Sequence, residues 1–139
     1  MTRQVLPQRS LAIVGLDFEN TSGPSRRFEL HMCQRGEPVE LRPEPKNPAD
    51  PQAVAVYSAR GIQLGYLSAE RAPWIGGMLK NGREIEAVFQ EITASGAALR
   101  IAFDGAIPEL PVLRAREDAD TASGADEDSG FWPDEIWDD

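Results

Sequence analysis

The chain has 139 residues, of which 41% are hydrophobic, which is enough for one globular domain with a buried core. Its net charge of −9 is unevenly spread: 14 basic and 13 acidic residues precede Glu117, whereas ten acidic and no basic residues make up the charges from Glu117 onward. The near-neutral body is compatible with a nucleic-acid partner. The single cysteine excludes an intrachain disulfide. No apolar run approaches the ~20 residues of a membrane helix.

The composition divides the chain into four expected segments. Residues 1–8 are polar and are expected to be flexible, and residues 9–104 carry the pattern of a folded domain. Residues 105–116 contain two prolines and form an extension that the sequence leaves undefined, and residues 117–139 form an acidic tail that is expected to be disordered at its start. The first residues lack the apolar core of a signal peptide, so a cytoplasmic location without a membrane partner is expected.

The first part of the domain shows the patterns of three strands. An apolar strand is predicted over residues 10–18, a loop over 20–25, a second strand over 28–33 and, after a turn, a third over 39–42. Cys33 ends the second of these strands, where a buried thiol is expected.

A rigid polar loop is predicted at residues 47–50 (NPAD). Pro48 fixes its own φ and disfavours helix at Asn47. Asn and Asp side chains can each bond backbone amides two residues on. The sequence therefore leaves two interpretations open: a self-capped turn, or a loop that presents Asn47 and Asp50 to a ligand. Strands are predicted on both sides of the following turn, over residues 53–57 and 62–67.

The hydrophobic period changes after Leu67. Ser68 as N-cap and apolar residues at helical spacing predict a helix over residues 69–80. Alternation predicts two more strands, over 83–92 and 98–103. Short strands with regular turns predict a mainly β fold, a small β-barrel with one or two short helices, because a parallel α/β sheet would need more helices between its strands.

Three segments of this domain resemble the HIRAN domain family. They are 13–16 (IVGL), 39–45 (VELRPEP) and 47–56 (NPADPQAVAV), and the strand at 65–67 together with the following helix extends the resemblance over residues 10–103. The resemblance implies a modified OB-fold barrel that binds single-stranded DNA, preferentially at a free 3′ end. It places Phe18 as a stacking aromatic and Asn47 and Asp50 on the binding loop, with Asp50 as the acceptor for the terminal hydroxyl.

The chain departs from the family pattern at four positions. Asp17 and Ala69 stand where the family offers basic side chains, Ala49 replaces an aromatic residue, and Tyr66 replaces a histidine.

The residue types add two members to the expected site. Phe18 and Tyr66 are either stacking platforms for bases or packed core residues. Arg42 is the preferred phosphate ligand over Arg26, Arg27 and Arg71, because it lies on the strand that enters the loop. The predicted site therefore consists of Phe18, Arg42, Asn47, Asp50 and Tyr66, in a non-catalytic module with no cofactor and no metal.

Two other functions remain open. The tail gathers Phe131, Trp132 and Trp137 among acidic residues, and this segment either competes with nucleic acid for the domain's groove or anchors a partner such as a DNA-repair or replication protein. The chain would in the latter case be a protein-interaction adaptor, using its groove or its FWPDEIW tail. A metal-dependent nuclease is the remote alternative, with magnesium held by Asp17, Glu19 and Asp50, although no motif supports it.

Overall fold

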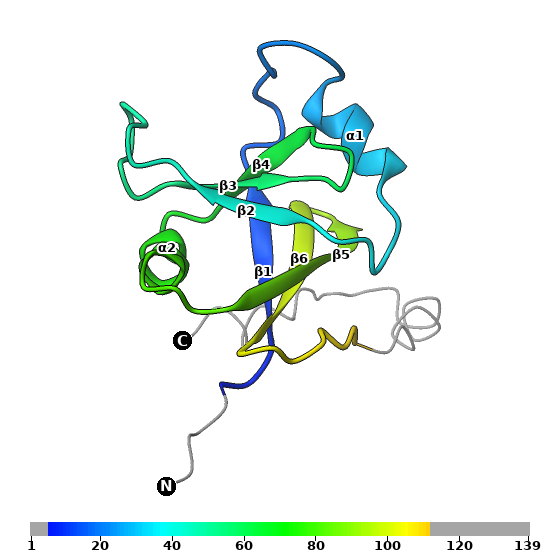
Figure 1. The fold of residues 1–139 in the computed structure, drawn as a ribbon. Helices are drawn as coiled ribbons and strands as arrows, with labels where there is room; N and C mark the ends of the chain where they lie inside the picture. The colour runs from blue at the N-terminus through cyan, green and yellow to red at the C-terminus, as the bar shows by residue number, and fades with distance from the viewer. Residues whose placement is uncertain (1–5, 112–139) are drawn as a thin grey trace, which may run out of the picture. The chain divides into compact units, whose positions relative to one another are not determined.

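Six strands and two helices make up residues 6–111, the part of the chain that the computed structural model describes (Figure 1). In chain order they are β1 (Arg9–Val14), α1 (Arg26–Met32), β2 (Glu40–Pro43), β3 (Val54–Tyr57), β4 (Gln63–Leu67), α2 (Ala72–Lys80), β5 (Ile85–Thr93) and β6 (Gly96–Phe103). Within these residues no helix has the length and apolarity needed to cross a membrane.

The six strands form one curled antiparallel sheet in the order β2-β3-β4-β1-β6-β5. Its two edges are joined by the segment before β2. Val39 donates its backbone N–H to Ala87 of β5 (3.0 Å), and Phe89 of β5 donates to Glu37 (2.7 Å). These bonds satisfy backbone groups that an open edge would expose. The predicted mainly β, barrel-like fold is confirmed.

The core lies inside the curl, and β3 and β6 are buried over most of their length. The largest fully buried members of the core are Leu11, Ile13, Leu30, Leu64, Ile75, Leu99, Ile101 and Phe103. Strand β4 approaches β1 closely at Gly65, where a Cβ atom would lie 2.3 Å from the carbonyl oxygen of Val14. Only glycine permits this approach, which brings the ends of β1 and β4 together.

The strand predicted over residues 28–33 is wrong, because this segment is the helix α1. Ser25 caps it by accepting the backbone N–H of Phe28 (3.0 Å). The apolar alternation of Phe28, Leu30 and Met32 suggested a strand with one buried face. Leu30 is indeed buried, but Phe28 is 58% exposed and Met32 is 49% exposed. The predicted buried strand position of Cys33 is also corrected, since this residue is the half-buried C-cap of α1.

A buried carboxylate fixes α1 to the turn between β3 and β4. Glu29 is 3% exposed and accepts hydrogen bonds from Ser58 Oγ (2.7 Å) and Arg60 Nε (2.6 Å). Arg60 also pairs with Glu37 ahead of β2 (3.0 Å). A buried charge needs such partners, and they hold the helix at one place on the sheet.

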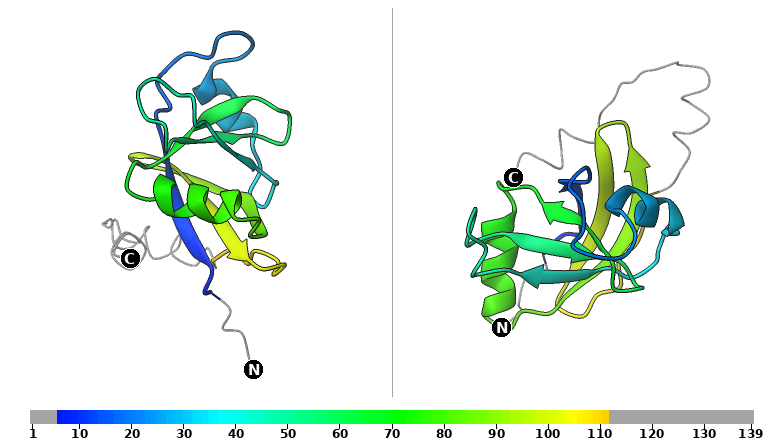
Figure 2. Two further views of the ribbon diagram at one scale, coloured as in Figure 1. Left: turned by 60° about the vertical axis from the view of Figure 1, so that its left-hand side comes forward. Right: turned by 90° about the horizontal axis from the view of Figure 1, so that it is seen from above.

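The second helix begins three residues later than predicted, at Ala72 rather than residue 69. Arg71 is its N-cap, and Ser68 instead forms the preceding turn, accepting the backbone N–H of Arg71 and of Ala72 (both 3.0 Å). Pro73 in the first turn fits this later start. Figure 2 shows α2 towards one end of β2 and β3 and α1 towards the other.

Candidate functional site

The loop between β2 and β3 is held by its own side chains. Asn47 Oδ1 accepts the backbone N–H of Ala49 (2.8 Å) and of Asp50 (3.1 Å). Asp50 Oδ1 accepts the backbone N–H of Gln52 (2.8 Å). All three bonds belong to local turns of the kind that Asn and Asp favour. The self-capped turn that the sequence allowed is therefore present, and it fixes the direction of both side chains.

Glu44 ties this loop to β4. Its Oε1 atom accepts two hydrogen bonds, from Asn47 Nδ2 (2.9 Å) and from the Tyr66 hydroxyl (2.8 Å). Burial, above all, raises the pKa of Tyr66, so its hydroxyl keeps the proton that it donates. Glu44 is a member of the site that sequence reasoning missed. Its position inside the proline-rich motif, two residues from Arg42, was the available signal.

Three side chains converge on Gly15, the residue that follows β1. The strand stops at Val14 rather than at residue 18 because Gly15 adopts a φ of +75°, in the left-handed region. A Cβ atom at this glycine would contact Phe18 Cδ2 at 3.6 Å, Arg26 Nη1 at 3.7 Å and Tyr66 Cδ1 at 3.8 Å. We call Gly15 and these three side chains the glycine notch. It combines two aromatic rings with a cation.

The two aromatic members of the notch differ in exposure. The Phe18 side chain lies in the loop after β1 and is 70% exposed, so it is not a core residue. Tyr66 is half-buried on β4, and its ring lies 5.6 Å from the Arg26 guanidinium carbon, a cation–π contact. Of the two interpretations open for Phe18, the packed core residue is excluded, and stacking on its ring stays a prediction.

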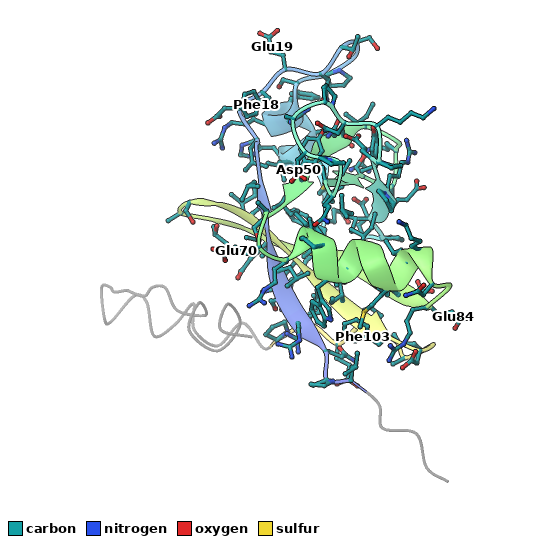
Figure 3. The ribbon with its side chains drawn as sticks, turned by 90° about the vertical axis from the view of Figure 1, so that its left-hand side faces the viewer. Phe18, Glu19, Asp50, Glu70, Glu84 and Phe103 are labelled. Atoms are coloured by element: carbon teal, nitrogen blue, oxygen red, sulfur yellow. The ribbon has the colours of Figure 1, made fainter. Side chains whose placement is uncertain are left out.

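Phe18 and Asp50 lie on the same side of α2 in Figure 3, although they come from the loops after β1 and after β2. Phe103 lies on the other side of α2 in that view.

Arg42 stands apart from this group. Its β2 position pairs with Ala55 of β3, which pairs in turn with Tyr66 of β4, so Arg42 and Tyr66 share a face of the sheet about 10 Å apart. The Arg42 guanidinium lies 3.7 Å from the centre of the Tyr57 ring and binds Glu40 (3.0 Å). The structure therefore brings together Phe18, Tyr66 and Asn47 but not Arg42.

Other predicted features fall outside the site. Asp17 pairs with Arg27 on the surface. Asp17, Glu19 and Asp50 form no metal-binding group, since residues 6–111 contain no cluster of three or more His, Cys, Asp or Glu. A hollow of about 170 Å³ lies between the β2–β3 loop and α2, and none of the predicted site residues lines it. The tail residues Phe131, Trp132 and Trp137 lie outside the described part of the chain.

The HIRAN domain family model matches residues 11–106, which is more than half of the chain. The chain belongs to the HIRAN family. The HIRAN domain of human HLTF, in a crystal structure, is similar with 24% identity and a TM-score of 0.57 over 71% of this chain and 76% of that one. A protein from Lactobacillus plantarum is similar with 17% identity and a TM-score of 0.60 over 71% and 92%.

An NMR structure of the HLTF HIRAN domain in its DNA-bound conformation is 23% identical, with a TM-score of 0.48 over 86% of this chain and 84% of that one. At these identities the two structures with the higher scores show a shared fold and nothing more. The search of curated proteins found no match.

Proposed function

We propose that this HIRAN domain binds single-stranded DNA at its 3′ end, without catalysis and without a cofactor. Membership of the HIRAN family supports DNA as the ligand, since the HLTF member of this family has been solved in a DNA-bound conformation. The local geometry of this chain supports the same ligand independently.

The exposed ring of Phe18 carries this proposal. An aromatic side chain that is 70% exposed gains little from the fold itself. It lies against Gly15 beside Tyr66 and Arg26, where a base can stack and a phosphate can find a cation. Stacking on an aromatic ring contributes about 1–3 kcal/mol per base. Phe18 and Tyr66 are thus the proposed stacking residues.

The β2–β3 loop is the proposed site of end recognition. Asp50 is the acceptor for the terminal 3′ hydroxyl in this proposal, and Asn47 holds the loop in place through its bonds to the backbone of residues 49 and 50. A carboxylate accepts a hydrogen bond from a hydroxyl but repels a phosphate. This chemistry predicts preference for a 3′ hydroxyl over a 3′ phosphate.

Fluorescence anisotropy with a ten-nucleotide thymidine strand tests the proposal on the full chain. The strand ending in a 3′ hydroxyl is expected to bind more tightly than the same strand ending in a 3′ phosphate. Asp50→Asn keeps an oxygen for the Gln52 amide and is expected to abolish this preference. Asp17→Asn is the matched control, because the exposed Asp17 carboxylate pairs with Arg27 and has no other partner within residues 6–111. Equal binding of the two strands by the unaltered protein would refute end recognition, and no binding would refute the DNA ligand.

The acidic tail is proposed to modulate this site. Its carboxylates resemble phosphates in charge and its aromatic residues Phe131, Trp132 and Trp137 resemble bases in shape, so it is suited to compete with DNA. The same three residues would also serve as anchors for a DNA-repair or replication protein.

A further inference from the structure

Arg26 is a buried arginine, which is unusual because most arginines of a folded protein are exposed to solvent. It is the first residue of α1 and is only 7% exposed. Its neighbour Arg27 has a side chain that is 52% exposed and pairs with Asp17. Burial of a cation is costly unless partners compensate it, so the partners of Arg26 decide what this residue does.

All the partners of Arg26 within the described chain are neutral. Its Nε donates to Asn20 Oδ1 (2.9 Å), its Nη1 donates to the carbonyl oxygen of Gly15 (2.8 Å), and its guanidinium carbon lies 5.6 Å from the centre of the Tyr66 ring. No carboxylate in residues 6–111 pairs with it, in contrast to Arg60, which binds Glu29 and Glu37, and Arg83, which binds Asp104. The positive charge of Arg26 is therefore oriented but not neutralised.

The guanidinium also keeps hydrogen-bonding capacity. An arginine has five N–H donors in a planar fork, and two nitrogens of Arg26, Nε and Nη1, have acceptors among residues 6–111, whereas Nη2 has none there. Asn20 is itself fixed, since its Nδ2 donates to the backbone oxygens of Pro24 and Gln63 (both 3.1 Å). These contacts hold the guanidinium in one orientation, so little side-chain entropy is lost when it binds an anion.

The surroundings of this cation indicate which anion it suits. Nη1 of Arg26 lies 3.7 Å from the Cβ position of Gly15, and the rings of Phe18 and Tyr66 lie 3.6 and 3.8 Å from the same position. A free inorganic anion would not need two aromatic rings. A nucleotide offers a flat base and a phosphate a few ångströms apart, which matches the mixture of rings and cation in the glycine notch.

We propose that Arg26 is the phosphate-binding residue of this site and takes one internal phosphodiester of the strand that stacks on Phe18. This proposal rests on the proposed single-stranded DNA ligand. It assigns the phosphate contact to a helix-borne arginine at the notch and not to Arg42, whose charge is already paired with Glu40.

A set of thymidine decamers, each with one uncharged methylphosphonate linkage, tests the assignment on the full chain by fluorescence anisotropy. With the unaltered protein, a methylphosphonate at one particular position is expected to weaken binding at least fivefold. Arg26→Gln is expected to weaken binding of the unmodified strand, and a methylphosphonate at that position should then reduce the affinity no more than one at any other position. The slope of log affinity against log salt should fall by about 0.7, the value for one phosphate contact on a single strand.

Arg27→Gln is the matched control, since it removes a neighbouring charge that is exposed and paired. It is expected to keep the sensitive linkage and the salt slope within error. Because Arg26 also holds Gly15 and Asn20, thermal melting must accompany each variant. If Arg26→Gln does not fold, Arg26→Lys retains the charge without the fork and is expected to keep the same sensitive linkage with a smaller penalty.

The outcomes separate this inference from the proposed function. Binding with no sensitive linkage, or with a sensitive linkage that Arg26→Gln or Arg26→Lys leaves at full strength, would overturn the role of Arg26 while leaving DNA binding intact. Failure of the unaltered chain to bind any decamer would overturn both.

Discussion

Phe18→Ala is the substitution that most directly separates binding from folding. The side chain is 70% exposed, so its removal costs the fold at most about 1 kcal/mol of apolar burial. If a base stacks on the ring, the same change removes about 1–3 kcal/mol of binding free energy. That loss corresponds to an affinity about 5- to 150-fold weaker.

Anisotropy titration of single-stranded DNA measures this loss, and a thermal melt of each protein measures the cost to stability. Phe28→Ala is the matched control, since Phe28 is also an exposed phenylalanine, at 58%, but lies on α1 and contributes nothing to the glycine notch. It is expected to leave affinity unchanged. A Phe18→Ala protein that folds normally and binds within twofold of the unaltered chain would refute stacking at this position, and an equal loss in both variants would indicate unspecific apolar contact.

Three further results are expected. Gly65→Ala should lower stability by about 1–3 kcal/mol or more, because its Cβ would lie 2.3 Å from the Val14 carbonyl oxygen, whereas Gly77→Ala, with nothing within 4 Å, should be neutral or stabilising in a thermal melt. Burial raises the pKa of Cys33 to about 11, so alkylation at pH 8 should be at least tenfold slower than for free cysteine and should accelerate as pH rises; a rate like that of free cysteine would contradict this. A chain ending at Arg116 should bind single-stranded DNA several-fold more tightly, and unchanged affinity would show that the tail does not compete.

The strands that surround the site could be predicted because their burial is recorded in short-range patterns. The run at residues 53–57 is apolar because β3 is buried on both faces except at its end. The segment 98–103 was also predicted as a strand, and β6 is buried there on both faces except at Arg100. The proline-rich loop was also predictable, since Pro, Asn and Asp restrict the backbone locally.

The helix α1 was not predicted because its seven residues make only about two turns, too few to show a 3.6-residue period in the apolar positions. Phe28, Leu30 and Met32 alternate by position, yet only Leu30 faces the core. What decides the helix is the cap at Ser25 together with the long-range anchor of Glu29 on Ser58 and Arg60, and the second of these is invisible to any local pattern.

The position of Arg26 could not be predicted for the same reason. Arg42 was favoured because it lies next to the loop in the sequence, but distance along the chain does not measure proximity in the fold. Arg26 reaches the notch only because α1 is held where it is, beside Gly15 and Tyr66. Its burial depends on the tertiary structure. The role of a cation follows from its burial and its partners more than from its place in a sequence motif.

The structure also changes how the β2–β3 loop is understood. The sequence set a self-capped turn against a ligand-binding loop as alternatives, but each carboxylate of the loop has two oxygens. Asp50 uses Oδ1 for the Gln52 amide, and Glu44 uses Oε1 for Asn47 and Tyr66. Within residues 6–111 the second oxygen of each has no hydrogen-bond partner. One oxygen of each carboxylate therefore builds the loop while the other makes no such bond, so a self-capped turn and the proposed recognition of a strand end are compatible rather than alternatives.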